Sequence, residues 1–177
     1  MTIRAYQNIT PNIDSSVFVD ESSIIIGDVD IGKDSSVWPL TAIRGDVNTI
    51  RIGDRTNIQD GSVLHVTHPH TAVPDGYALT IGNNVTIGHK VILHGCCIED
   101  DCLIGMGVVI MDGAMVRRQV LVGAGSLVPP GKDLESGYLW LGSPVKRVRE
   151  LTSDEKKWIE YSSGHYVDLK NKHMGSE

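Results

Sequence analysis

The sequence predicts an all-β solenoid, in which short parallel strands wind into stacked coils, followed by one C-terminal α-helix. The first observation is an aliphatic residue at eighteen positions spaced mostly six apart. The second is a small or β-branched residue four positions after sixteen of these eighteen anchors. A helical period of 3.6 residues cannot produce this spacing, and a plain two-residue strand period would not turn every six residues. The anchors are Ile13, Val19, Ile25, Ile31, Val37, Ile43, Ile52, Ile58, Leu64, Ile81, Ile87, Leu93, Ile98, Ile104, Ile110, Val116, Val122 and Val128.

This pattern resembles the hexapeptide repeat of left-handed parallel β-helices. In that fold three hexapeptides make one triangular coil, the anchors point inward at its corners, and coils stack at the ordinary strand spacing of ~4.8 Å. Left-handed crossovers are rare in parallel sheets, so the hand is taken from the resemblance alone. The repeat predicts about six coils over residues 13–131.

Three irregular steps interrupt the period, and all of them fall between the third and the first corner of a coil. Insertions in a solenoid are expected to map to one face or edge. The irregular steps therefore support the corner assignment. They are nine residues from Ile43 to Ile52, seventeen from Leu64 to Ile81, and five from Leu93 to Ile98.

A chain of 177 residues is expected to form one domain. Residues 1–12 are predicted to lead into the β-helix, which spans 13–132. After Lys132 the period stops, so residues 133–177 are predicted to form an irregular crossing segment, a helix and a tail.

The C-terminal helix is predicted over about residues 153–171, along the outside of the prism. Thr152 and Glu155 have the spacing of a capping box at its start. Several residues then recur at helical spacing: Trp158, Tyr161, Ser162, His165 and Leu169.

Composition narrows the class of protein. The chain has 19 glycines, 5% aromatic residues and a single Phe, which suits a narrow prism filled with aliphatic side chains. The net charge of -6 argues against a nucleic-acid partner. No apolar run is long enough for a membrane span, and no secretory leader is recognised, so we expect a cytoplasmic protein. Cys96, Cys97 and Cys102 form no CxxC pair and are expected to be small core residues in a reducing compartment.

Two columns of polar residues are predicted on the outside of the prism. Arg44, His65 and His94 each follow a third-corner anchor directly, so they share one column. His65 and His94 fall on adjacent coils, where their rings can reach one ion. A second column, at another corner, follows the second-corner anchors and contains Gln59, Asp60 and His89.

A metal site is predicted only if two copies of the chain share it. His89 and His94 are five residues apart in extended chain, about 16 Å, so they cannot bind one ion within a subunit. A catalytic zinc ion usually has three protein ligands and a water. Packing the third-corner face of one chain against the second-corner face of another supplies the missing histidine, and a threefold ring does so at each of three interfaces. On geometry alone, solvated histidines without a metal remain the alternative.

Over nearly its whole length, from about residue 10 to the helix, the chain resembles the gamma-class carbonic anhydrases and their carbonic-anhydrase-like relatives. The resemblance implies a homotrimer that holds zinc, or iron or cobalt, between His65 and His94 of one subunit and His89 of its neighbour. The segments that carry it are Arg44-Gly45-Asp46, Asn57-Ile58-Gln59-Asp60-Gly61, Leu64-His65 and Gly88-His89-Lys90-Val91-Ile92-Leu93-His94-Gly95.

The resemblance also implies the reaction, the reversible hydration of carbon dioxide to bicarbonate by a metal-bound hydroxide. Gln59 would hydrogen-bond the metal-bound water, and Arg44 would help to hold bicarbonate. Asp46 and Asp60 would pair with Arg44 across the interface, and Tyr161 would overhang the site. For Arg44, Asp46 and Asp60, contacts between subunits without a chemical role are the alternative.

One departure from the family pattern concerns the proton shuttle. The best-studied members carry acidic residues after the Arg-Gly-Asp and in the loop after the first ligand, but this chain has Val47 and a loop without Glu. His68 in that loop is the predicted replacement, because imidazole titrates near neutrality. His68 and His70 are also possible further ligands.

Three functions therefore stay open: a carbonic anhydrase, a metal-binding trimer that acts on another small molecule or structurally, and a coenzyme A-dependent acyltransferase. Gly142-Ser143-Pro144-Val145-Lys146 occurs in similar form in both enzyme groups and does not separate them.

Overall fold

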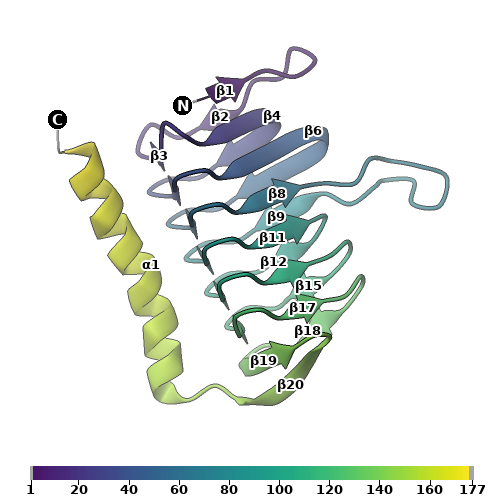
Figure 1. The fold of residues 1–177 in the computed structure, drawn as a ribbon, viewed down its shortest axis with the longest axis vertical. Coiled ribbons are helices and arrows are strands. Elements are labelled where there is room, and N and C mark those ends of the chain that lie inside the picture. Colours follow the sequence, from purple (N-terminus) through teal and green to yellow (C-terminus); the bar gives the residue numbers. More distant parts are fainter. Residues whose placement is uncertain (1, 176–177) are drawn as a thin grey trace.

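The computed structural model describes residues 2–175, which form a parallel β-solenoid flanked by one long helix (Figure 1). The solenoid has three faces, named here after one strand of each. The β8 and β9 faces belong to a 12-stranded sheet, because β4 and β6 are long enough to run from one face onto the other. The β10 face is a separate 8-stranded sheet.

Short parallel strands stack in register on each face. On the β8 face lie β1 (Thr2–Arg4), the first parts of β4 (Ile24–Ile31) and β6 (Ala42–Ile52), then β8 (Val63–His65), β11 (Ile92–His94), β14 (Val109–Ile110) and β17 (Leu127–Val128). On the β9 face lie β2 (Asn12–Ile13), the later parts of β4 and β6, then β9 (Leu79–Ile81), β12 (Cys97–Ile98), β15 (Met115–Val116) and β18 (Asp133–Leu134). On the β10 face lie β3 (Phe18–Val19), β5 (Ser36–Val37), β7 (Asn57–Ile58), β10 (Thr86–Ile87), β13 (Leu103–Ile104), β16 (Leu121–Val122), β19 (Tyr138–Gly142) and the antiparallel β20 (Val145–Glu150).

The predicted anchors form the core. All of them are buried except Ile13 and Val19, which are partly buried and pack against the others. Anchors at the same corner pair across successive strands, as Ile43 does with Leu64 and Leu64 with Leu93. Full burial of one such side chain contributes about 1.5–3 kcal/mol, so the aliphatic columns hold each coil in register.

The prediction that the repeat ends at Lys132 is wrong. Leu134 and Trp140 continue the six-residue step after Val128, and both are buried. Trp140 lies in register with Val122, so residues 133–150 form β18, β19 and β20 instead of an irregular crossing segment. This coil did not match the aliphatic pattern because Lys132 occupies a position usually held by a small residue, and because Trp140 replaces the aliphatic anchor at the last corner.

The stack is also longer than predicted at its beginning. Residues 2–4, expected to be a lead-in, pair in parallel with Ile24–Ile26. The β10 face alone stacks seven parallel strands from β3 to β19, rather than about six coils.

The helix α1 (Ser153–Met174) begins at the predicted capping box, in which Thr152 and Glu155 each bond the other's backbone nitrogen. It runs along the β10 face and contacts β3, β5 and β10 (Figure 1). Its buried residues are Ile159, Ser162, Ser163 and Lys170. No helix in residues 2–175 combines the length and apolar character needed to cross a membrane.

The residues that recur at helical spacing do not form one buried face of the helix. Ser162 is buried, but Trp158 and Tyr161 are 57% and 56% exposed, and His165 is exposed beside them. Ser162 instead packs against Thr86 of β10, with the two hydroxyl oxygens 3.0 Å apart. The rings of Trp158, Tyr161 and His165 contact one another at the outer surface.

Candidate metal centre

The two histidines of the third-corner column meet at the edge of the β8 face. His65 and His94 end β8 and β11 at the same register position, directly after the buried anchors Leu64 and Leu93. With the anchors turned inward, strand alternation turns both imidazoles outward. His65 Nδ1 lies 3.1 Å from His94 Nε2.

This spacing fits two ligands of one metal ion. Two nitrogens bound at 2.0–2.1 Å in a tetrahedral zinc site lie about 3.3 Å apart. Within residues 2–175, no group of three or more His, Cys, Asp or Glu side chains is arranged to hold a metal. The described chain therefore supplies two adjacent ligand positions here, and any third protein ligand must come from elsewhere.

Carboxylates select the tautomers of both rings. His94 Nδ1 lies 2.6 Å from Asp112 Oδ1, and His65 Nε2 lies 3.2 Å from Asp46 Oδ1. Because ionised carboxylates only accept hydrogen bonds, they draw the ring protons to those two nitrogens. The nitrogens that face each other across 3.1 Å then present lone pairs only, an arrangement that a bound cation relieves.

The surroundings of His65 favour the neutral form of its ring. Burial is the main cause that lowers the pKa of His65, and the nearby charge of Arg44 lowers it further, against the hydrogen bond to Asp46. Burial raises the pKa of Asp46, but hydrogen bonds from Arg44 and His65 outweigh it and leave the pKa below its usual value. A neutral imidazole is the form that binds a metal.

His89 lies on the other column, as predicted, and shows the same arrangement as His94. It follows β10, and its Nδ1 donates to Asp60 Oδ2 at 2.9 Å. Its Nε2 is left as the possible metal donor on a side chain that is 44% exposed. The structure does not bring His89 into the His65–His94 pair within one chain.

Arg44 and Gln59 are held in defined orientations. Arg44 Nη1 forms an ion pair with Asp46 Oδ2 at 2.6 Å within the same chain. Gln59 is buried, and its Nε2 donates to Asn57 Oδ1 at 3.0 Å. Gln59 Oε1 is therefore the group left free to accept a hydrogen bond.

His68 and Tyr161 lie apart from the histidine pair. His68 is exposed on the long loop between β8 and β9, with its ring centroid 5.4 Å from that of His70. Tyr161 stacks on His165 at 5.7 Å between ring centroids. In residues 2–175, no hydrogen bond or ring contact joins either residue to His65 or His94.

The cysteines are free thiols. Cys96 and Cys102 are buried, whereas Cys97, predicted to be inward, is only half-buried because the five-residue step before Ile98 shifts the alternation. Burial raises the pKa of Cys102 to about 12 and that of Cys96 further still, so both thiols are protonated and unreactive.

Sequence reasoning missed an apolar stripe on the β8 face. Its members are the outward residues that immediately precede each third-corner anchor, and they pair with one another from strand to strand. Ile24, Val63 and Ile92 are 40%, 44% and 43% exposed. The signal was present in the sequence, because only the third corner has an apolar residue at this position in every coil. The stripe consists of Ile24, Ala42, Val63, Ile92, Val109 and Leu127.

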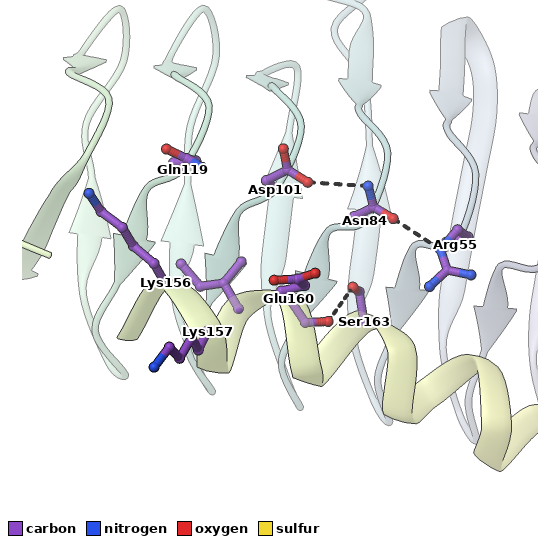
Figure 2. Close-up of a pocket in the computed structure, with 9 residues that line it drawn as sticks. Arg55, Asn84, Asp101, Gln119, Lys156, Lys157, Glu160 and Ser163 are labelled. Carbon is purple, nitrogen blue, oxygen red and sulfur yellow. Dashed lines mark hydrogen bonds between the residues drawn. The ribbon is translucent and has the colours of Figure 1, made fainter. Parts of the chain in front are cut away.

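A separate pocket of about 390 Å³ lies between α1 and one column of turns (Figure 2). Arg55 Nε donates to Asn84 Oδ1, and Asn84 Nδ2 donates to Asp101 Oδ1, so part of its polar lining is already paired. The pocket mixes lysines with Asp101 and Glu160 and contains none of the predicted site residues.

Three of the similar proteins match over nearly all of this chain. Protein YrdA of Escherichia coli (strain K12) is 54% identical over 172 residues, which cover 97% of this chain and 94% of that protein. Gamma carbonic anhydrase 2, mitochondrial, of Arabidopsis thaliana is 43% identical over 166 residues, covering 93% of this chain and 59% of that one. The crystal structure of a hexapeptide transferase family protein from Anaplasma phagocytophilum matches with a TM-score of 0.88 and 38% identity, over 96% of each chain. No protein-family profile matches the chain.

Proposed function

Because the chain belongs to the gamma carbonic anhydrase-like family of hexapeptide-repeat proteins, we propose that it catalyses the reversible hydration of carbon dioxide to bicarbonate. The family includes gamma carbonic anhydrases and proteins named as transferases, so membership alone does not select the reaction. The observation that carries the proposal is the convergence of His65 Nδ1 and His94 Nε2, with both ring protons turned away toward carboxylates.

The proposed ligands are His65 and His94 of one subunit and His89 of the partner subunit. Zinc fits this nitrogen donor set, and iron or cobalt suits imidazole as well. When bound, such an ion lowers the pKa of a coordinated water to about 7 and so supplies a nucleophile at neutral pH. Asp112 and Asp60 hold His94 and His89 in the tautomer that leaves Nε2 free.

Gln59 and Arg44 act around the substrate in this proposal. Gln59 Oε1 accepts a hydrogen bond from the attacking water and orients its lone pair toward the carbon of carbon dioxide. Asn57 keeps the amide from turning over, because it accepts from Gln59 Nε2. Arg44 is 47% exposed, and its guanidinium donates to the oxygens of bicarbonate as they gain negative charge. Asp46 limits the movement of Arg44 and also binds His65.

A homotrimer is proposed for two reasons: the metal site needs a ligand from a second chain, and the exposed apolar stripe would be buried against that chain. An exposed row of aliphatic side chains on the face between the two histidine columns is the kind of surface that marks a subunit interface. Burial of Val63 and Ile92 against a second copy would bring the third-corner column of one chain toward the second-corner column of the next. Asp46 and Asp60 would then lie where ionic contacts between subunits form.

His68 is proposed as the proton shuttle. It is exposed on the loop that begins directly after His65, and its imidazole can carry protons between the site and buffer. Tyr161 is proposed to overhang the site of the assembled trimer from the outer surface of α1, where it is exposed.

Two other functions compete. A trimer could bind metal without hydrating carbon dioxide and act on another small molecule or structurally. A coenzyme A-dependent acyltransferase is favoured by the names of two similar solved structures, a "putative acetyltransferase" from Bacillus cereus and the hexapeptide transferase family protein. That chemistry does not require two imidazoles with converging lone pairs.

The test combines metal analysis with stopped-flow carbon dioxide hydration, on protein loaded with zinc and, separately, with iron under anaerobic conditions. A carbonic anhydrase is expected to accelerate hydration in both directions and to lose activity with its metal. Metal bound without hydration would favour the metal-binding trimer. No metal, together with acyl transfer from an acyl-coenzyme A, would favour the acyltransferase.

A further inference from the structure

We propose that the loop between β8 and β9 fixes the orientation of His94, with Asp112 and Thr67 as positioning residues. This inference builds on the proposed function only in taking His94 as a metal ligand. The loop covers residues 66–78 and extends away from the solenoid next to β8 and β9 (Figure 1).

A chain of two hydrogen bonds leads from the loop to the ligand. Thr67 Oγ1 donates to Asp112 Oδ2 at 2.9 Å, and the other oxygen of the same carboxylate, Oδ1, accepts from His94 Nδ1 at 2.6 Å. Both oxygens of Asp112 are thus engaged. The hydroxyl of Thr67 determines how the carboxylate is rotated, and the carboxylate determines both the tautomer and the direction of the His94 ring.

Asn48 ties the loop down at both of its ends. Its Nδ2 donates to the carbonyl oxygen of Thr67 at 3.1 Å and to that of Asp75 at 2.9 Å. Thr67 and Tyr77 also exchange backbone hydrogen bonds at 3.0 Å in each direction. The base of the loop is therefore a small two-stranded clasp, which keeps Thr67 in place above Asp112.

Glycine at two turn positions lets the loop approach this closely. A Cβ on Gly95 would lie within 2.6 Å of both Asp112 Oδ1 and the Cβ of Tyr77, and a Cβ on Gly113 would lie 3.0 Å from the Tyr77 ring. The residues that follow His94 and Asp112 thus pack against Tyr77 at the end of the loop. The loop inserted between β8 and β9 therefore supports the orientation of His94 from the outside of the solenoid.

The consequence is that loop residues control metal affinity without touching the metal. Partners that orient a ligating histidine typically contribute 10–100-fold to metal affinity. Removal of the Thr67 hydroxyl frees Asp112 to rotate, so the expected loss is smaller than the loss on changing Asp112 itself.

Asp112→Asn makes the sharpest variant because it changes the sense of a hydrogen bond. Thr67 still donates, so it favours the amide oxygen on its own side. The amide nitrogen then faces His94 Nδ1 as a donor, which moves the ring proton to Nε2 and blocks that nitrogen as a ligand. We expect a 10–100-fold weaker metal affinity for Asp112→Asn and up to about tenfold for Thr67→Val, which keeps the shape of the side chain.

The experiment measures two quantities on the same proteins. Chelator competition gives the zinc dissociation constant, and ¹⁵N imidazole NMR of the metal-free protein gives the tautomer of His94. Thr71→Val is the matched control, because it removes an exposed hydroxyl of the same loop. The inference predicts an Nδ1–H tautomer in the parent protein and in Thr71→Val, an Nε2–H tautomer in Asp112→Asn, and a mixture in Thr67→Val.

Unchanged tautomer and unchanged zinc affinity in both Asp112→Asn and Thr67→Val would overturn the inference. If the parent protein binds no metal at all, the proposed function fails, but the tautomer in the metal-free protein still decides whether the loop orients His94. If Thr71→Val weakens zinc binding as much as Thr67→Val does, the loss of affinity comes from general loosening of the loop. The specific role of Thr67 is then refuted.

Discussion

Val63 and Ile92 lie in register on β8 and β11, two residues before the two histidines, and their side chains are 44% and 43% exposed. The same strands thus present an apolar pair and a pair of imidazoles to the outside, on either side of the buried anchors Leu64 and Leu93. Assembly and metal binding are therefore expected to depend on one surface.

A charged pair in the stripe should separate the subunits. Val63→Lys together with Ile92→Lys places two like charges at the proposed interface, where their desolvation is unfavourable. The molar mass measured by light scattering should then fall from about 58 kDa, three times the chain mass of 19.3 kDa, to that of a monomer. Bound metal should be lost at the same time. Val148→Lys, at an apolar position on β20 that is 53% exposed, is the control and should remain a trimer. A charged-stripe variant that stays trimeric would show that the interface lies elsewhere.

Removal of the proposed shuttle should affect turnover in a buffer-dependent way. In weak buffer, His68→Ala is expected to hydrate carbon dioxide more slowly, and added imidazole should restore the rate because it replaces the lost proton carrier. The affinity for bicarbonate should change little, since the histidine pair and Gln59 are untouched. His70→Ala serves as the comparison from the same loop. Equal rates for His68→Ala and the parent protein at all buffer concentrations would leave His68 without a catalytic role.

The capping box should contribute measurably to stability. Thr152→Ala removes the side-chain acceptor of the Glu155 backbone nitrogen and is expected to cost about 1 kcal/mol of the free energy of unfolding. Urea unfolding measures this cost, with Ser153→Ala as the neighbouring control. A loss no larger than that of the control would mean that tertiary contacts alone fix the start of α1.

Glu155 should also make stability depend on pH. Hydrogen bonds from Arg149, then from the Thr152 backbone, lower the pKa of Glu155 to about 2 in the folded protein. The unfolded value is near 4.3, so this stabilisation is fully present above about pH 4.3 and is lost as the pH falls toward about 2. Glu155→Gln should flatten the pH dependence of the melting temperature in that window. If the melting temperature of Glu155→Gln falls with acid as it does in the parent protein, other carboxylates cause the pH dependence.

The hexapeptide period predicted the solenoid, its core and the outward columns because a repeat determines where each side chain points. That is why His65 and His94 could be paired before any coordinates. The same period was wrongly ended at Lys132. Leu134 and Trp140 are buried and continue it, but Trp140 is not aliphatic and so did not match the pattern. Helical spacing also did not show which face of α1 meets the solenoid, where Ser162 is buried whereas Trp158 and Tyr161 are exposed.

Contacts between distant segments could not be predicted from the period. Asp112 reaches His94 from the next coil, 18 residues away, and Thr67 reaches Asp112 across 45 residues from an insertion without a repeat. Rotamers and loop paths decide such contacts, and neither follows from spacing. The placement of His89 opposite the histidine pair of another subunit stays a prediction for the same reason.

Single substitutions of the three proposed ligands provide the baseline for the central claim, which is that two chains share each metal. His65→Ala, His89→Ala and His94→Ala should each abolish metal binding, although His89 belongs to another column. Mixing His89→Ala chains with His94→Ala chains then gives trimers in which one interface joins an intact His65–His94 pair to an intact His89. Inductively coupled plasma mass spectrometry on purified mixed trimers should find one metal ion per trimer, against three in the parent protein and none in either variant alone. Verified mixed trimers without metal, or a monomer that retains stoichiometric metal, would contradict the shared site.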